Sequence, residues 1–355
     1  MRILAAMSGG VDSSVAALLL QRQGHDVVGV FFRNGVTGGG HGAVPGGAAT
    51  KSCCSASDAR DAALVCDRLG IPFYSVDYAA EFDALIEHFA AEYRRGRTPN
   101  PCVLCNQQLK FGHVFRLADD IGADAIATGH YARADGGRLL RASDRDKDQT
   151  YYLFGIDRAV LPRVRFPLGD LRKAEVRELA RGAGLVTAQK PESMEICFVT
   201  SGDYRDVVRA RGGPGRPGRV VDGSGREVAR HDGVDAFTVG QRRGLPALGA
   251  PHYVAAIDAA SGDVTVAPRE GLGARSAVVE GVRWLCDPPA AGGELHVAAQ
   301  VRARSPAMPA TLAVASAGSV RATFAAPMFA VTPGQAAVFY DGDQVLGGGW
   351  IERAE

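Results

Sequence analysis

The chain has 355 residues, of which 46% are hydrophobic and 22% charged, which is typical of a globular protein long enough for two or three domains. A formal net charge of +1 excludes a uniformly basic surface, so any RNA contact has to come from local clusters of Arg and Lys. No stretch approaches the roughly 20 apolar residues of a membrane span, and residues 1–7 are too short for a signal-peptide core, so we expect a cytoplasmic protein.

The first half of the chain alternates short apolar runs with helical patterns. Residues 2–7 and 27–32 predict buried strands, with a helix between them over about 13–23. This alternation predicts a parallel sheet with helices on both faces. Further elements are expected as strands at 73–76 and 125–128 and as helices over 55–70, 81–95 and 106–121.

Beyond about residue 200 the pattern becomes β-like, with short strands between glycines and prolines. Strands are expected at 236–239, 253–257 and 336–340, and the segment 212–218 predicts a loop. We expect three domains, an α/β domain over 1–200 and two β-rich domains over 201–270 and 271–355. The glycine-rich segment 35–50 has no assigned role.

The first motif is Ser8-Gly9-Gly10-Val11-Asp12-Ser13-Ser14, between the first strand and the first helix. Glycines let the backbone approach a phosphate chain, and the helix N-terminus adds a partial positive charge. Asp12 would repel phosphate directly, so we expect it to hold Mg²⁺. The alternative is a structural turn in which Asp12 or Ser13 caps the helix.

This motif resembles the PP-loop of the ATP pyrophosphatase superfamily, whose members cleave ATP to AMP and pyrophosphate. The superfamily includes amidating ligases as well as tRNA-modifying enzymes, so the motif alone does not select a substrate.

The cysteines narrow the choice. A Cys-x-x-Cys pair, Cys102 and Cys105, lies in a proline-containing loop expected just before a helix capped by Asn106, where a thiol pKa is lowered. Cys197 lies in a second loop region. Half of a zinc site is the alternative, but the sequence shows no second pair to complete it. Cys66 and Cys286 are interpreted as structural, and the adjacent Cys53 and Cys54 could be either structural or reactive, with a structural role favoured.

Together with the PP-loop, these cysteine segments resemble the tRNA-uridine 2-sulfurtransferase (tRNA-specific 2-thiouridylase) family nearly end to end. Further matching motifs span residues 127–131, 146–152, 240–245 and 332–340. The resemblance implies a PP-loop ATP pyrophosphatase domain with a parallel sheet and flanking helices, followed by two small β-rich domains, the last a β-barrel. It also implies ATP-dependent adenylation of the 2-carbonyl of the wobble uridine, position 34 of tRNA, and replacement of its oxygen by sulfur.

By the same resemblance, Cys197 carries sulfur as a persulfide and Cys105 is its partner nucleophile, which leaves a Cys105–Cys197 disulfide for a reductant to reopen. A cysteine desulfurase or sulfur-relay protein would supply the sulfur. The expected substrates are glutamate, glutamine and lysine tRNAs.

Some family members have Asp where this chain has Cys102, two residues after Asn100. An acid there could act as a general base, and Cys102 fills that role less obviously. Three thiols, Cys102, Cys105 and Cys197, would also suit an iron–sulfur cluster with one open iron site, which we keep as a second mechanism.

The family also assigns contact residues. ATP contacts transfer to Ala6, Met7, Ser8, Gly9, Gly10, Val11, Asp12, Ser13, Phe32 and Gly129. Contacts to tRNA transfer to Asn100, Pro101, Cys102, His130, Lys147, Asp148, Gln149, Arg302, Ala303 and Gln335. Phe32 is nearly as well explained as a core strand residue, and His130 as a hydrogen-bonded loop residue.

Two rival functions stay open. One is a PP-loop ligase that transfers nitrogen and needs neither Cys105 nor Cys197. The other is a non-catalytic tRNA- or metal-binding protein, against which the intact Asp12 and thiols argue. Arginine clusters at 94–97, 205–211, 242–243 and 302–304 are candidate phosphate contacts, although each alone is more often a solvated surface.

Overall fold

The computed structural model describes residues 1–35, 56–192, 196–199 and 203–355. The chain divides into two compact units. Unit 1 comprises residues 1–85, 102–203 and 343–345, and unit 2 comprises residues 86–101, 204–342 and 346–355. Within the described ranges, no helix is long and apolar enough to cross a membrane. The domain boundaries expected at residues 200 and 270 stay a prediction.

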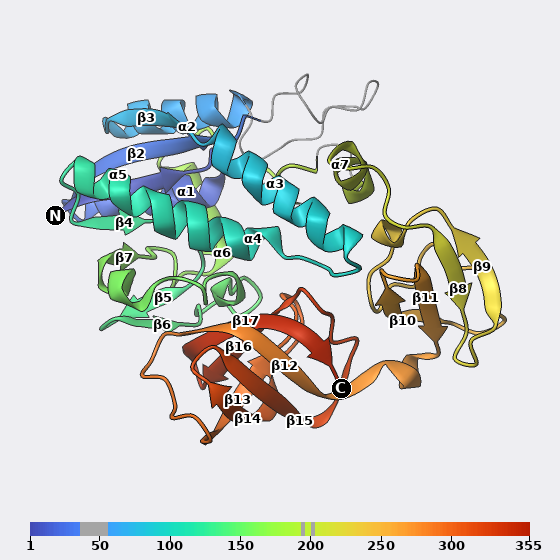
Figure 1. Ribbon diagram of the computed structural model, residues 1–355. Helices are drawn as coiled ribbons and strands as arrows, with labels where there is room; N and C mark the ends of the chain where they lie inside the picture. The colour runs from blue at the N-terminus through green and yellow to red at the C-terminus, as the bar shows by residue number, and fades with distance from the viewer. Residues whose placement is uncertain (36–55, 193–195, 200–202) are drawn as a thin grey trace. The chain divides into compact units, whose positions relative to one another are not determined.

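Unit 1 is built on a parallel five-stranded sheet with strand order β3-β2-β1-β4-β7 (Figure 1). The apolar side chains of the central strands are buried on both faces, as expected of strands between two helical layers. The predicted parallel sheet is therefore confirmed, with one further short strand, β7. The strands are β1 (Arg2–Met7), β2 (Asp26–Arg33), β3 (Phe73–Asp77), β4 (Ala125–Ala127) and β7 (Val164–Arg165).

Helices cover both faces of this sheet. Helix α1 contacts α2 and α6, and α5 lies on the opposite face (Figure 1). Residues from nearly all sides of α1 are buried, including Val15, Ala16 and Leu18, because it packs between the sheet and two helices. The helices are α1 (Val11–Arg22), α2 (Ala56–Leu69), α3 (Ala79–Arg94), α5 (Val114–Asp120) and α6 (Lys173–Gly182). The expected start of the second helix at Ser55 lies outside the described residues.

Short elements fill the remainder of unit 1. Two hairpin strands and two 3₁₀ helices precede α6. They are β5 (Arg133–Asp135), β6 (Arg138–Leu140), η2 (Thr150–Tyr152) and η3 (Arg158–Arg163).

The expectation of a loop through the Cys-x-x-Cys pair is wrong. Helix α4 (Pro101–Leu104) begins at Pro101 and continues without a break into a π-helix, η1 (Cys105–His113), and then α5. Proline suits the first position of a helix because its φ is already helical and it lacks the N–H group that would go unbonded there. Cys102 is therefore in the first helical turn, whereas Cys105 lies one turn inside.

Unit 2 contains the C-terminal part of α3, the helix α7, a four-stranded sheet and a closed six-stranded barrel. The sheet has strand order β10-β11-β8-β9, and the barrel runs β12-β15-β14-β13-β16-β17 and closes through β12–β17 pairing. Alternate side chains of the barrel strands form its core, in which Leu312, Phe324 and Phe339 are buried. The expected β-barrel is thus confirmed. The elements are α7 (Tyr204–Ala210), β8 (Gly218–Val221), β9 (Glu227–His231), η4 (Val234–Ala236), β10 (Tyr253–Asp258), β11 (Asp263–Ala267), η5 (Arg269–Leu272), β12 (Gly273–Trp284), β13 (Glu294–Gln300), β14 (Met308–Ser316), β15 (Ser319–Phe329), β16 (Ala336–Asp341) and β17 (Gln344–Ala354).

The strand expected at 236–239 is also wrong, whereas those at 253–257 and 336–340 are confirmed. A 3₁₀ turn, η4, occupies 234–236 instead. Asp235 is fully buried there and accepts a hydrogen bond from the amide of Gly215 at 2.7 Å. This buried polar contact selects a turn where the apolar pattern alone favoured a strand.

Candidate functional site

The PP-loop lies where the strand order of the sheet reverses. The chain places β2 on one side of β1 and β4 on the other. The carboxyl end of β1 is therefore a topological switch point, where open α/β sheets bind ligands. Residues 8–10 follow β1, and residues 128–130 follow β4 at the same edge.

Two glycines allow the close approach of backbones at this edge. Gly9 has φ of +68°, and a Cβ on it would lie 2.3 Å from the carbonyl oxygen of Asp58. A Cβ on Gly129 would lie 2.6 Å from the amide nitrogen of Ser13. Both positions therefore require glycine, and Gly129 packs directly against the PP-loop backbone.

Hydroxyl groups hold the turn that opens α1. The Ser13 hydroxyl accepts from the amide of Ser8 at 3.1 Å and donates to the carbonyl of Gly10 at 3.2 Å. Ser14 donates to the same carbonyl at 2.8 Å, and Thr187 donates to Ser14 at 3.0 Å. No side chain caps α1 at Gly10. The first amides of α1 therefore face the loop without a side-chain cap, an arrangement suited to an anion. The alternative of an Asp12 or Ser13 cap is not what the structure shows.

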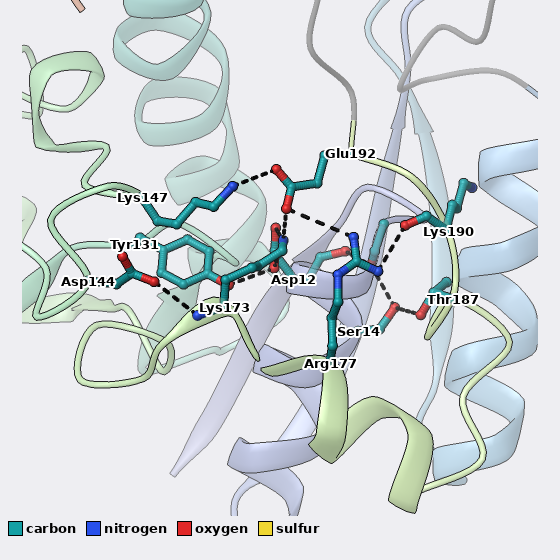
Figure 2. Close-up of polar contacts among 12 residues, drawn as sticks. Asp12, Ser14, Tyr131, Asp144, Lys147, Lys173, Arg177, Thr187, Lys190 and Glu192 are labelled. Carbon is teal, nitrogen blue, oxygen red and sulfur yellow. Dashed lines mark hydrogen bonds and ion pairs between the residues drawn. The ribbon is translucent and has the colours of Figure 1, made fainter. Parts of the chain in front are cut away.

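Asp12 is held by two side chains from distant parts of unit 1 (Figure 2). The Tyr131 hydroxyl donates to Asp12 Oδ1 at 3.0 Å, and Lys173 Nζ lies 2.7 and 2.8 Å from the two carboxylate oxygens. Tyr131 is only 2% exposed, and burial, followed by the Asp12 charge, raises its pKa far above the usual range. Tyr131 therefore stays protonated and donates.

A second carboxylate joins this group. Glu192 accepts from Lys147 Nζ at 2.8 Å and lies 3.0 Å from Lys173 Nζ (Figure 2). Burial alone would raise the pKa of Glu192, but the hydrogen bonds and charges of the two lysines lower it. Lys173 therefore sits between two carboxylates, one on the PP-loop and one on the segment leading to Cys197.

Lys190 fixes the other side of the loop. Its Nζ donates to the carbonyl of Gly9 at 2.8 Å and to Asp58 at 2.6 Å, and it also pairs with Asp61. Burial alone would lower the pKa of Lys190, but the two carboxylates raise it. This charged lysine ties the PP-loop to the start of α2.

The sequence analysis assigned no role to Tyr131, Lys173, Lys190 or Glu192. Tyr131 lies in the family motif at 127–131, but its hydroxyl bonds to Asp12, which is 119 residues away in the sequence. Lys173, which also binds Asp12, is 161 residues away from it. Local periodicity and spacing carry no signal for such pairs. One local feature does lie next to a missed residue. The Glu175 side chain accepts a hydrogen bond from the amide of Arg172, and this contact marks the start of α6, where Lys173 lies.

The remaining predicted ATP contacts lie at the ends of β1 and β2 and just after β4. Ala6 and Met7 end β1, and Gly129 touches the loop as described. Phe32 is half-buried near the end of β2, with its ring centroid 5.2 Å from that of Tyr78. Its contact with adenine stays a prediction.

The three candidate cysteines all belong to unit 1. Cys102 is exposed, and Cys105 and Cys197 are half-buried. Cys197 lies in a turn in which the amide of Val199 donates to the carbonyl of Ile196 at 2.9 Å, and Phe198 and Val199 are buried. Cys66, in contrast, is fully buried, and burial raises its thiol pKa to about 12, which supports a structural role. Cys53 and Cys54 lie outside the described residues.

In the part of the chain that the structure describes, no group of three or more His, Cys, Asp or Glu side chains could hold a metal ion. The iron–sulfur cluster on Cys102, Cys105 and Cys197 stays a prediction. Asp12 supplies a carboxylate of the kind that Mg²⁺ prefers, and its role in holding this ion stays a prediction.

The candidate tRNA residues of unit 1 are largely engaged within the chain. Asp148 accepts from the amide of Ala142 at 3.0 Å and from Thr150 at 2.8 Å. Gln149 accepts from the amide of Tyr131 at 2.9 Å. His130 bonds Thr128 at 2.7 Å, and burial, with Lys110, keeps its pKa well below the usual range, so the ring is neutral near pH 7.

Two candidate tRNA residues of unit 2, Arg302 and Gln335, border a cavity of about 310 Å³. Arg302 donates to the carbonyls of Val239 and Ala330 at 3.0 and 2.8 Å, and Gln335 donates to the carbonyl of Thr98 at 2.8 Å. Asn100 is buried. The cavity is lined by Thr98, Thr238, Val239, Gly240, Gln241, Arg302, Thr332 and Gln335.

Three family models match the chain in succession. The first, described as the tRNA methyl transferase HUP domain, matches residues 1–201. The others, described as the tRNA methyl transferase PRC-barrel domain and the aminomethyltransferase β-barrel domain, match residues 206–268 and 274–351. These models bear out the expected architecture of an α/β domain followed by two β-rich domains.

Full-length relatives decide the family. The tRNA-specific 2-thiouridylase MnmA of Rhodospirillum centenum is 45% identical and covers 100% of this chain and 92% of its own length. That of Geobacter metallireducens is 46% identical, covering 99% of this chain and 97% of its own. The chain belongs to the tRNA-specific 2-thiouridylase family. A solved 4-thiouridine synthetase in complex with RNA and bound ATP has a TM-score of 0.37 and 17% identity, covering 57% of this chain and 46% of that one. The full-length relatives confirm the thiouridylase resemblance read from the motifs, and the rival readings of a nitrogen-transferring ligase and a non-catalytic binding protein are set aside.

Proposed function

We propose that this chain uses ATP to adenylate the 2-carbonyl of uridine 34 in tRNA and then replaces that oxygen with sulfur. The observation that carries the proposal is full-length similarity to 2-thiouridylases in a chain whose PP-loop, Cys105 and Cys197 share one compact unit. The products are 2-thiouridine, AMP and pyrophosphate.

The first step activates a poor electrophile. The uridine 2-oxygen attacks the α-phosphorus of ATP, and the bond to the β-phosphate breaks, releasing pyrophosphate. The first amides of α1 and the ammonium of Lys173 face the charge that develops on the phosphates. Asp12 would hold Mg²⁺, which would neutralise the phosphate oxygens there.

The second step exchanges AMP for sulfur. The terminal sulfur of a Cys197 persulfide adds to C2 of the uridine, and AMP leaves with the oxygen. Cys105 thiolate then attacks the Cys197 sulfur, which forms a Cys105–Cys197 disulfide and leaves the transferred sulfur on the base. Alternatively, Cys105 first releases that sulfur as hydrosulfide, and the same disulfide results. Two electrons from a reductant reopen the disulfide, and a cytoplasmic location would supply them.

The tRNA contacts are part of this proposal. A base has to leave its stack to reach a buried adenylation site. We place Asn100, Pro101 and Cys102 beside the extruded uridine, and glutamate, glutamine and lysine tRNAs as substrates. A cysteine desulfurase or sulfur-relay protein would load Cys197. An iron–sulfur mechanism is the alternative outcome of the test below.

The test incubates purified protein with ATP, Mg²⁺, a cysteine desulfurase with cysteine as the persulfide donor, and unmodified glutamate tRNA, in air and anaerobically after cluster reconstitution. The RNA is digested for nucleoside mass spectrometry. We expect 2-thiouridine in both conditions, and its loss in Cys105→Ser and Cys197→Ser. Cys286→Ser, in the barrel of unit 2, is the matched control and should keep activity.

Other outcomes discriminate the alternatives. If 2-thiouridine forms only after cluster reconstitution and Cys102→Ser is inactive, the iron–sulfur mechanism is supported instead of the persulfide mechanism. AMP formed with some other acceptor and no thiolated nucleoside would overturn the proposed function and leave only the ATP pyrophosphatase activity.

A further inference from the structure

Asn106 directly follows Cys105 in a rare type of helix. Helix α4 passes into the π-helix η1 at Cys105, and η1 continues into α5 without a break (Figure 1). A π-helix is seldom used in proteins, and where it occurs it often lies at a functional site. Asn106 is buried, with 3% of its surface exposed, whereas Cys105 is half-buried. A buried amide therefore lies next in the chain to a thiol that the proposed mechanism uses.

The two ends of the Asn106 amide have different surroundings. Its Nδ2 donates to the carbonyl of Tyr152 at 3.0 Å. Its Oδ1 is buried and has no hydrogen-bond partner among the described residues. An interior amide that makes only part of its hydrogen bonds costs stability relative to an apolar side chain. Fold stability alone therefore does not explain why asparagine occupies this position.

Tyr152 belongs to a short segment that hydrogen bonds fix in place. The amide of Tyr152 donates to the carbonyl of Gln149 at 2.9 Å. Thr150 is fully buried, and its hydroxyl donates to the Asp148 carboxylate at 2.8 Å. The Tyr152 carbonyl therefore has a defined position, and a side chain that donates to it is held there.

The same segment holds a residue of the nucleotide site. The amide of Gln149 donates to the carbonyl of Tyr131 at 2.9 Å, and the Gln149 side chain accepts from the amide of Tyr131 at 2.9 Å. The Tyr131 hydroxyl in turn donates to Asp12 of the PP-loop at 3.0 Å. A continuous series of hydrogen-bonded residues within unit 1 therefore joins Asp12 to Asn106.

We propose that Asn106 is a positioning residue that sets the place of Cys105 relative to the nucleotide site. The inference rests on the proposed function for the role of Cys105. The contact between Asn106 and Tyr152 fixes the first turn of η1, and that turn carries the thiol. Loss of the contact should impair the sulfur step, since a reacting group displaced by about 1 Å can lose about a hundredfold in rate. Adenylation should change little, because the hydrogen bonds of Asp12 are kept.

The experiment compares wild type with Asn106→Leu and Asn106→Ala. Leucine has the branched shape of asparagine but forms no hydrogen bond, whereas alanine also leaves a cavity. Single-turnover reactions use an excess of protein, loaded with sulfur by a cysteine desulfurase and cysteine, over unmodified glutamate tRNA. Pyrophosphate release reports adenylation, and nucleoside mass spectrometry reports 2-thiouridine. For both variants we expect pyrophosphate release within about threefold of wild type and 2-thiouridine formation lowered by about tenfold or more.

Stability measurements separate this role from a purely structural one. Asn106→Leu should unfold at a higher urea concentration than Asn106→Ala, although both lose the sulfur step alike. Val103→Ala is the matched control, because Val103 is fully buried in α4, two residues before Cys105, and its truncation lowers stability without removing the Asn106 contact. This control should form 2-thiouridine within about threefold of the wild-type rate. A loss of 2-thiouridine that follows the loss of stability across the three variants, or an equal loss of pyrophosphate release, would overturn the inference.

A second readout does not depend on thiolation. Iodoacetamide labelling of Cys105 in the reduced protein, followed by peptide mass spectrometry, is compared with labelling of Cys102, which is exposed in the preceding turn. In Asn106→Leu the ratio of Cys105 to Cys102 labelling should rise by about threefold or more, because a turn that is no longer held opens more often. An unchanged ratio would contradict the inference. If wild type makes no 2-thiouridine, the proposed function fails, and the labelling ratio still decides whether Asn106 positions Cys105.

Discussion

Replacing Gly9 by alanine should disrupt the PP-loop in two separable ways. Gly9 has φ of +68°, a left-handed conformation that costs a non-glycine residue about 1–2 kcal/mol. The new Cβ would also lie 2.3 Å from the Asp58 carbonyl oxygen and 2.8 Å from two further backbone atoms of Asp58. Relieving such a contact moves the loop or α2, and overpacking of this kind costs about 1–3 kcal/mol. The sum is a loss of about 2–5 kcal/mol in the free energy of unfolding.

Gly24 supplies the matched control. Its φ is +80°, and a Cβ there meets nothing within 4 Å, so Gly24→Ala carries the backbone strain without the clash. Urea unfolding should show a loss of about 1–2 kcal/mol for Gly24→Ala and a larger loss for Gly9→Ala. Pyrophosphate release at varied ATP should show a KM raised by about tenfold or more in Gly9→Ala alone, because the loop has moved. Equal stability losses and an unchanged KM in both variants would refute this reasoning.

Three further predictions follow from the same region. Tyr131→Phe removes the 3.0 Å hydrogen bond to Asp12 and should lower the rate of pyrophosphate release by about tenfold at a stability cost of about 1 kcal/mol; a wild-type rate would contradict the role of the hydroxyl. Glu192 has a folded pKa below its usual 4.5, so its ionised form stabilises the fold above that pH and the contribution disappears as pH falls through the folded pKa. Urea unfolding should therefore show Glu192→Gln destabilised relative to wild type at pH 7, with a smaller difference as pH falls below 4.5, and an equal difference throughout would argue against it. With a pKa of about 12, roughly one Cys66 thiol in ten thousand is ionised at pH 8. Iodoacetamide should therefore label the exposed Cys102 and leave Cys66 unmodified in the folded protein. Rapid labelling of Cys66 would show that its thiol is not buried.

Local pattern was sufficient for much of this protein. Apolar runs of six residues predicted β1 and β2 because a strand between two helical layers is apolar on both faces, and a shorter run predicted the edge strand β3. The glycines of the PP-loop predicted a close backbone approach to phosphate, which stays a prediction, and the structure shows Gly9 close to the backbone of Asp58. The motifs around Cys105 and Cys197 also indicated the family, since each is a short segment read directly from residue order.

Contacts between segments that are distant in the sequence could not be predicted from residue order. Asp12 was expected to hold Mg²⁺, but its bonds to Tyr131 and Lys173 depend on where β4 and α6 lie against β1. The buried Asp235 made a turn at 234–236, where the apolar pattern favoured a strand. Sequence determined the strands, helices and reactive side chains because these depend on neighbouring residues. Only the tertiary structure decided which charges meet, because an ion pair such as Glu192 with Lys147 depends on a distance in space that residue order does not contain.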